Sequence, residues 1–253
     1  MFTTVHFIWL GICALVLAAG VYGLKKYKPS LKTVLNIACI VCVISELIKM
    51  FSMIRMVPSS DGGTFYPYIE MQHLPLHLCS LQIILIFYVR FAKESALRTA
   101  ICGFIYPTAI AGAFFAVMMP SIFNGTIERS AAFVHPLAYQ FFLYHTMLIL
   151  LGICIPMSGE IKLCRKHYGT TLGILLGVAL VSLYLNSMFA QPIYANGALV
   201  SLEYVPNFFF TYEAPIPIAL TQLWHWYVYL GVLLVLAVLL VTLFYLPWLK
   251  KKE

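Results

Sequence analysis

Residues 216–248 read IPIALTQLWHWYVYLGVLLVLAVLLVTLFYLPW, a stretch without a single aspartate, glutamate, lysine or arginine. A helix needs about 20 mostly apolar residues to cross the hydrocarbon core of a bilayer, and this stretch is long enough. Six other apolar stretches precede it. The sequence therefore predicts seven membrane-spanning helices, at about residues 5–24, 33–56, 72–92, 99–119, 133–156, 169–190 and 216–248.

The composition of the whole chain agrees with this interpretation. Hydrophobic residues make up 62% of the 253 positions and charged residues only 10%. A soluble domain of this size could not carry that composition without exposing large apolar surfaces. Because little chain remains between the stretches, we expect one all-α domain over residues 1–253, a polytopic bundle of seven helices. The seven cysteines lie mostly inside the helices and predict no disulfide framework.

Lysine and arginine predict the orientation of this bundle. They gather in alternate connections, at residues 25–32, 90–98, 162–166 and 250–252, whereas the connections at 57–71, 120–132 and 191–215 hold only Arg129. Because cytoplasmic loops retain lysine and arginine, we expect the N-terminus outside the cytoplasm and the C-terminus inside. The net charge of +7 then reflects topology and attraction to anionic lipid headgroups, and nucleic acid is excluded as a partner.

Polar side chains inside the apolar stretches mark the candidate site. Such groups are costly in a membrane and are functional candidates by default. At about 1.5 Å per residue, many of them fall in the outer half of the bundle, which predicts a polar cavity that opens to the outside while the inner half is almost featureless. They are Glu46, Lys49, His73, His77, Cys79, Ser80, Gln82, His145, Asn186 and His225.

Simpler structural roles remain open for several of these residues. Glu46 and Lys49 are three residues apart, so they can pair on one face of a helix. Asn186 can bond a neighbouring helix. The long outer connection at 191–215, rich in aromatics, fits either an interfacial aromatic belt or a lid over the cavity.

The most specific segment is His73-Leu74-Pro75-Leu76-His77-Leu78-Cys79-Ser80. Within a helix that starts at about residue 72, His73, His77 and Ser80 would share one face. Pro75 would be tolerated in the first turn, where its missing N–H needs no partner.

Three chemistries fit this segment. Cys79 or Ser80 can attack an ester, with a histidine as general base and Glu46 as the orienting group. His73, His77 and His145 can instead ligate zinc. The same groups can also bind a substrate or relay protons without any covalent step.

Four segments carry a resemblance to a known family: residues 73–82 (HLPLHLCSLQ), residues 142–148 (FLYHTML), Asn186-Ser187-Met188-Phe189 and Trp224-His225-Trp226-Tyr227. The chain resembles the YwaF-like bacterial seven-helix membrane proteins. More distantly, it is similar to the animal transmembrane protein 164 family, acyltransferases that use a cysteine nucleophile to move acyl chains between phospholipids. A Pro-Cys-His-Leu run holds that cysteine, and the match here is Pro75-Leu76-His77-Leu78. His77 and His145 match family histidines, whereas Leu76 stands in place of the cysteine.

The resemblance implies an intramembrane acyltransferase or lipid hydrolase that acts on phospholipid acyl groups from the outward-facing cavity. Cys79 would be the nucleophile, His77 and His145 the base and a second proton carrier or oxyanion donor, and Glu46 the orienting carboxylate. The expected binding residues are His73, Ser80, Gln82, Lys49, Asn186 and His225, and we expect neither a metal nor a cofactor.

The alternative is a small-molecule transporter or a heptahelical ligand sensor without catalysis. The sequence shows neither an inverted repeat nor matching broken helices, which are typical of transporters. For either function, the resemblance implies a multi-pass protein of the bacterial cytoplasmic membrane whose partners are membrane lipids and a lipid or small-molecule substrate.

Overall fold

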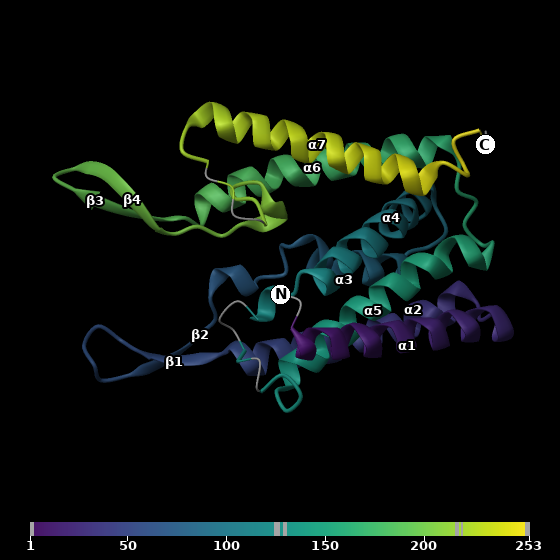
Figure 1. Cartoon of the computed structure of the whole chain (residues 1–253), viewed down its shortest axis with the longest axis horizontal. Coiled ribbons are helices and arrows are strands. Elements are labelled where there is room, and N and C mark those ends of the chain that lie inside the picture. The colour runs from purple at the N-terminus through teal and green to yellow at the C-terminus, as the bar shows by residue number, and fades with distance from the viewer. Residues whose placement is uncertain (1–2, 124–126, 129–130, 216–217, 219, 251–253) are drawn as a thin grey trace.

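The computed structural model of the chain describes residues 3–123, 127–128, 131–215, 218 and 220–250, and these residues form a bundle of α-helices (Figure 1). The helices are α1 Thr4–Tyr27, α2 Leu31–Met53, α3 Leu78–Phe91, α4 Ala96–Met118, α5 Pro136–Ser158, α6 Arg165–Met188 and α7 Leu223–Tyr245. Six of them are long and apolar enough to cross a membrane, and α3, with 14 residues, is shorter. The prediction of a polytopic helical membrane protein is confirmed, whereas seven crossings and the orientation stay predictions.

The start of α3 differs from the sequence prediction. The chain forms a 3-10 turn, η1 Met71–His73, and then a non-helical turn at residues 74–77, and α3 begins only at Leu78. The cause is Pro75, since a residue before proline avoids the helical region, and Leu74 accordingly has ψ 148°. His77 is extended as well, with φ −74° and ψ 155°. The predicted helical face shared by His73, His77 and Ser80 is therefore wrong.

Helices α4 and α5 form the centre of the bundle. In each of them 56% of the residues in the most apolar 18-residue stretch are buried, against 11% in α1 and α6 and 6% in α7. The two central helices approach closely at Gly152, where an added Cβ would lie 2.9 Å from the backbone oxygen of Tyr106. The outer helices thus present most of their apolar surface to lipid, and α4 and α5 form a rigid frame for polar groups.

Two antiparallel hairpins extend from one end of the bundle (Figure 1). Strand β1 Arg55–Pro58 pairs with β2 Phe65–Tyr68, and β3 Gln191–Ala195 pairs with β4 Ala198–Tyr204. Asn196 and Gly197 form the second turn with φ 53° and 78°, the backbone that a two-residue Asn-Gly hairpin turn requires. The all-α prediction did not include these strands.

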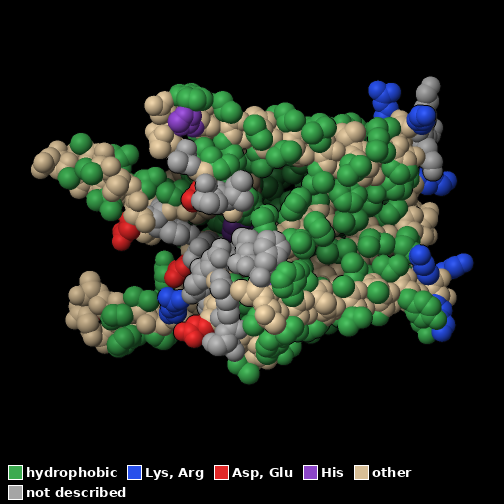
Figure 2. Space-filling view, in the orientation of Figure 1, with side chains coloured by type: hydrophobic (Ala, Val, Ile, Leu, Met, Phe, Trp, Pro, Cys, Tyr) green, Lys and Arg blue, Asp and Glu red, His purple; other side chains and the backbone are tan. Residues whose placement is uncertain are grey.

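The two ends of the bundle differ in charge. In Figure 2, most of the lysine and arginine side chains gather at one end, whereas the aspartate and glutamate side chains in view lie at the other end, near the hairpins and beside a smaller basic group. We call the first the basic end, formed by the connections at 25–32, 90–98 and 159–166 and by residues 246–250. The opposite end is called the hairpin end. Figure 2 also shows the surface hollowed toward the hairpin end, between α6–α7 and the other helices.

Candidate active site

The candidate site lies where α3 begins, at the hairpin end. The helical ladder starts with the bond from Leu81 N to the His77 carbonyl, at 2.8 Å. The N–H groups of Leu78, Cys79 and Ser80 precede this bond, so they have no partner within the helix. Amides at a helix N-terminus favour negative charge. The first turn of α3 can therefore donate hydrogen bonds to an oxyanion that forms near Cys79.

Tyr144 joins this turn to α5. Its side chain is buried, and its hydroxyl donates to the Cys79 carbonyl at 2.7 Å. A polar group of α5 thus meets the first turn of α3 inside the bundle. Sequence reasoning missed Tyr144, although it stands beside His145, because a bond between two helices leaves no spacing pattern in either one.

His145 follows Tyr144 on α5 and is buried, with 7% of its surface exposed. Its Nδ1 lies 2.6 Å from the Phe141 carbonyl oxygen, which can only accept, so Nδ1 carries the proton and Nε2 is the free base of the neutral ring. The ring packs against the rings of Phe141 and Tyr144 at 4.4 and 5.4 Å between centroids. A backbone carbonyl therefore orients the imidazole.

Glu46 pairs with Lys49, Nζ to Oε1 at 2.7 Å, the simpler role that their spacing had left open. A role for Glu46 in orienting His145 stays a prediction. The charges continue toward the hairpins, because Glu70 lies 3.6 Å from Arg55 and 3.9 Å from His73. Burial lowers the pKa of His73, and the Glu70 carboxylate acts in the opposite direction. Lys49 and His73 thus belong to a network of alternating charges beside the site.

Gln82 lies one turn beyond Cys79 and is fully buried. Its Nε2 donates to Thr108 Oγ1 on α4 at 2.9 Å, while its Oε1 has no hydrogen-bond partner within the described part of the chain. Such unsatisfied acceptors are rare in protein interiors. On the same face of α4, Gly112 leaves space beside the thiol, since a Cβ there would lie 3.5 Å from Cys79 Sγ. Gln82 is therefore an available acceptor near Cys79.

Residues 207–214, which we call the cap loop, cover the start of α3. Phe208 is fully buried, and its ring meets the His77 ring edge to face at 5.1 Å between centroids. Asn186 holds the loop from α6, because its Oδ1 accepts from Phe208 N at 2.9 Å and its Nδ2 donates to Thr211 Oγ1 at 2.9 Å. The lid interpretation of the outer connection gains support, and Asn186 bonds this loop rather than a neighbouring helix.

The remaining predicted residues lie outside these contacts. His225 is in the first turn of α7, its Nδ1 is 3.4 Å from Thr221 Oγ1, and its ring meets the Trp224 ring edge to face. Ser80 is half-buried in the first turn of α3. Across the described residues, no three histidine, cysteine, aspartate or glutamate side chains gather as a metal site would require. The zinc alternative therefore has no ligand set among them.

Together, these features define a polytopic helical membrane protein in which the first turn of α3, with Cys79, is bonded to Tyr144 of α5 near one end of the bundle. The chain belongs to the TMEM164 family, whose profile matches residues 1–245. No curated protein and no solved structure matches the chain.

Proposed function

We propose that this protein is an intramembrane acyltransferase or lipid hydrolase of the YwaF-like bacterial type, and that its active site is the start of α3. The observation that carries the proposal is the 2.7 Å bond from Tyr144 to the Cys79 carbonyl. This bond ties the first turn of α3, whose amides have no partner within the helix, to the turn of α5 that bears His145. Family membership supports the same reaction class, because a histidine matching His145 belongs to the family pattern.

Cys79 takes the role that the family cysteine has in its relatives. Leu76, at the family position, lies in the turn just before α3, with its N–H bonded to the Leu74 carbonyl at 2.7 Å. Cys79 lies in the first turn of the same helix. Both positions flank one helix N-terminus, so a thiol at 79 approaches an acyl group held by the same amides.

In the proposed reaction, His145 or His77 accepts the Cys79 thiol proton, and the sulfur attacks the ester carbonyl of a phospholipid. A C–S bond forms, and the first-turn amides of α3 stabilise the oxyanion. The lipid C–O bond then breaks, and the histidine returns its proton to the leaving oxygen. A second lipid hydroxyl resolves the thioester in a transferase, and water does so in a hydrolase.

The rest of the site supplies access and exclusion of water. An acyl chain can enter sideways from the bilayer, since α1, α6 and α7 expose most of their apolar surface. Phe208, over His77, shields the reacting groups on the hairpin side, and a dry site strengthens electrostatic stabilisation. We place the basic end in the cytoplasm of a bacterium and the hairpin end outside.

The test is acyl transfer by the purified protein in lipid nanodiscs, followed together with labelling by a thiol-reactive acyl mimic. Wild type is expected to be labelled and to produce a new acyl lipid or a free fatty acid. Cys79→Ala and His145→Ala should lose both, and Cys102→Ala, a buried cysteine of α4, is the matched control. Turnover retained by Cys79→Ala overturns the cysteine mechanism. Folded wild type without labelling or turnover favours the ligand sensor or transporter.

A further inference from the structure

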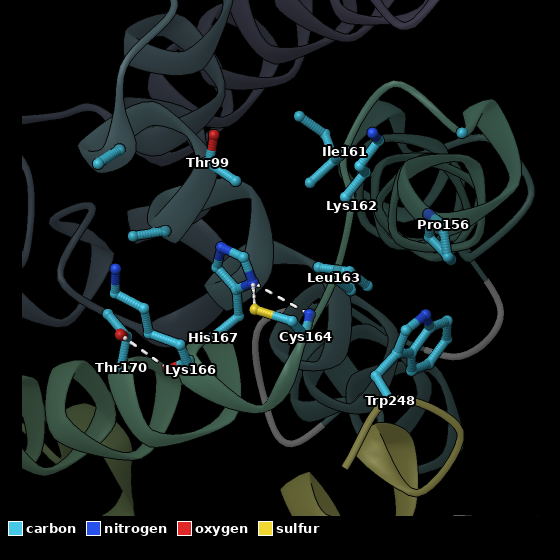
Figure 3. A pocket seen from close by; sticks show the side chains of 13 residues that line it. Thr99, Pro156, Ile161, Lys162, Leu163, Cys164, Lys166, His167, Thr170 and Trp248 are labelled. Carbon is cyan, nitrogen blue, oxygen red and sulfur yellow. Dashed lines mark hydrogen bonds between the residues drawn. The ribbon is translucent and has the colours of Figure 1, made fainter. Parts of the chain in front are cut away.

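A second cysteine–histidine pair lies at the basic end, where the sequence had predicted an almost featureless inner half. A pocket of about 680 Å³ opens there between α4, the connection from α5 to α6, the start of α6 and the residues after α7. Figure 3 shows Cys164 and His167 pointing toward one another inside it. Pockets of this size hold drug-sized ligands.

The hydrogen bonds of His167 show which of its ring nitrogens carries the proton. Cys164 is the residue before α6, and its Sγ lies 3.1 Å from Nδ1 of His167. The backbone N–H of Cys164 also donates to that nitrogen, at 3.1 Å. Because an N–H can only donate, Nδ1 carries no proton, and the imidazole is neutral with its hydrogen on Nε2. The thiol and the backbone N–H of Cys164 therefore share the single lone pair of Nδ1, and Sγ accepts from the backbone N–H of His167. The thiol proton can pass to that shared lone pair, as a nucleophile and its base require.

His167 is pressed against the backbone of α4. A Cβ added at Gly103 would lie 3.1 Å from the His167 Cβ and 3.0 Å from the Tyr245 hydroxyl oxygen. That hydroxyl donates to the Gly103 carbonyl at 2.8 Å. Helices α4, α6 and α7 therefore meet tightly around the histidine, and a base fixed in this way is organised before any ligand arrives.

The pocket lining indicates what such a thiol would meet. Lys162 and Lys166 line the pocket on opposite sides of the Cys164–His167 pair, and Leu163, Pro156 and Trp248 supply apolar surface (Figure 3). Lysine and a helix N-terminus both attract phosphate. The lining thus suits a ligand with an anionic part and an apolar part. The Cys164 thiol would then face the point at which these two parts of the ligand are joined.

Thiol exchange with a thioester needs no reactant besides the thiol and the thioester. Disulfide formation would require an oxidant, and zinc would require more ligands than the described residues gather. A thioester brings its own leaving group, and phosphates on that leaving group would meet the two lysines. The apolar chain of the donor would lie against the apolar wall at the membrane edge.

We propose that Cys164 is the nucleophile of a second site, which takes a long-chain acyl group from a thioester donor whose leaving thiol carries phosphates. His167 Nδ1 accepts the Cys164 proton, the bond between Sγ and the acyl carbon forms, and the C–S bond of the donor breaks. The departing thiolate takes the proton back from His167. The products are acylated Cys164 and a free thiol. This site is separate from Cys79 and does not rest on the function proposed above.

The test is incubation of the full chain in nanodiscs with palmitoyl coenzyme A, followed by intact-protein mass spectrometry. One hydroxylamine-sensitive palmitoyl group is expected on wild type, on Cys79→Ala and on Cys154→Ala, the last removing a buried cysteine of α5. Cys164→Ala should take up none. His167→Gln, which can still accept from the Cys164 amide, should slow acylation about 100-fold or more. Acylation that persists in Cys164→Ala, or absence of acylation in folded wild type, overturns the proposal.

A second probe tests the phosphate contact. Palmitoyl-N-acetylcysteamine is a thioester without phosphates, and wild type is expected to react with it about tenfold or more weakly than with palmitoyl coenzyme A. The double variant Lys162→Ala and Lys166→Ala should lose this preference while it keeps its reaction with the phosphate-free donor. Equal use of the two donors by wild type would contradict the proposed donor class.

Discussion

The two ends of the bundle each place a cysteine at the start of a helix, but the histidine that we propose as its partner is positioned differently at each end. At the basic end, Cys164 and His167 are three residues apart and their side chains lie 3.1 Å from each other. At the hairpin end, Cys79 is on α3 and His145 on α5, and the bond that connects their helices runs from Tyr144 to a backbone carbonyl.

This difference teaches what each end depends on. The basic-end pair is built by one helix start, so it survives as long as α6 forms. The pair proposed for the hairpin end depends on the packing of α3 against α2 and α4, on the bond from Tyr144 of α5 to α3, and on the cap loop above it. We therefore expect the hairpin end to respond to changes in helix packing, and the basic end to respond mainly to changes that touch its own residues.

The largest expected effect is a difference in lipid turnover between a variant of Cys79, at the hairpin end, and a variant of Cys102, in the frame formed by α4 and α5. Cys79→Ala should lower lipid acyl turnover by about 10⁴-fold or more, as loss of a nucleophile does. Cys102→Ala, which removes a fully buried thiol of the frame, should leave turnover within about twofold of wild type. Both are measured by product formation in nanodiscs, with thermal unfolding as the control for folding. Equal losses in the two variants would mean that packing, not chemistry, explains the effect.

Much of the frame could be predicted from sequence, because an apolar run long enough to cross a bilayer has few other stable structures. Helices α1, α2 and α4 lie within a few residues of the predicted stretches. The start of α3 differs from the prediction because Pro75 keeps the residue before it, Leu74, out of the helical region. The Asn196-Gly197 turn with flanking Ile193 and Leu199 was a readable hairpin signal.

Local contacts were more predictable than contacts between helices. The pairing of Glu46 with Lys49 follows from their spacing, and the structure confirms it at 2.7 Å. Cys164 and His167 have the spacing of a capping box, so that pair could have been found as well. The bond from Tyr144 to Cys79 and the contact of Phe208 with His77 could not, because only the folded bundle brings those segments together.

Two glycines on α4, one near each end, provide the next test of the comparison between the two ends. Gly103→Ala brings a methyl group to 3.0–3.1 Å from Tyr245 and His167, whereas Gly112→Ala meets the Leu78 and Cys79 side chains only at 3.3–3.5 Å. Overpacking costs about 1–3 kcal/mol, so Gly103→Ala should destabilise the protein and slow acylation of Cys164. Gly112→Ala should be close to neutral, since alanine also favours the helix. Thermal unfolding and intact mass measure both effects. The reverse ranking would contradict the packing described for α4.

Two tyrosines give a smaller, matched effect. Tyr144→Phe removes the bond to the Cys79 carbonyl, and Tyr245→Phe removes the bond to the Gly103 carbonyl. Each should cost about 0.5–1.5 kcal/mol of stability. The functional results should differ, because a misplaced α3 lowers lipid turnover about 10- to 100-fold only in Tyr144→Phe. Turnover assays on both variants decide this, and an equal loss of lipid turnover would remove the proposed role of Tyr144.

The smallest expected effect is a pH dependence of stability that arises from His73, at the hairpin end. Burial lowers the pKa of His73 from its usual value, against the pull of Glu70 and with help from Lys49 and Arg55. The unfolded chain therefore binds the proton more readily than the folded protein, so stability falls as pH drops below the usual histidine pKa of about 6.5. His73→Gln should reduce this loss in melting curves recorded above and below that pH. An unchanged slope would show that other groups carry the dependence, and a slope of opposite sign would mean that Glu70, not burial, dominates at His73.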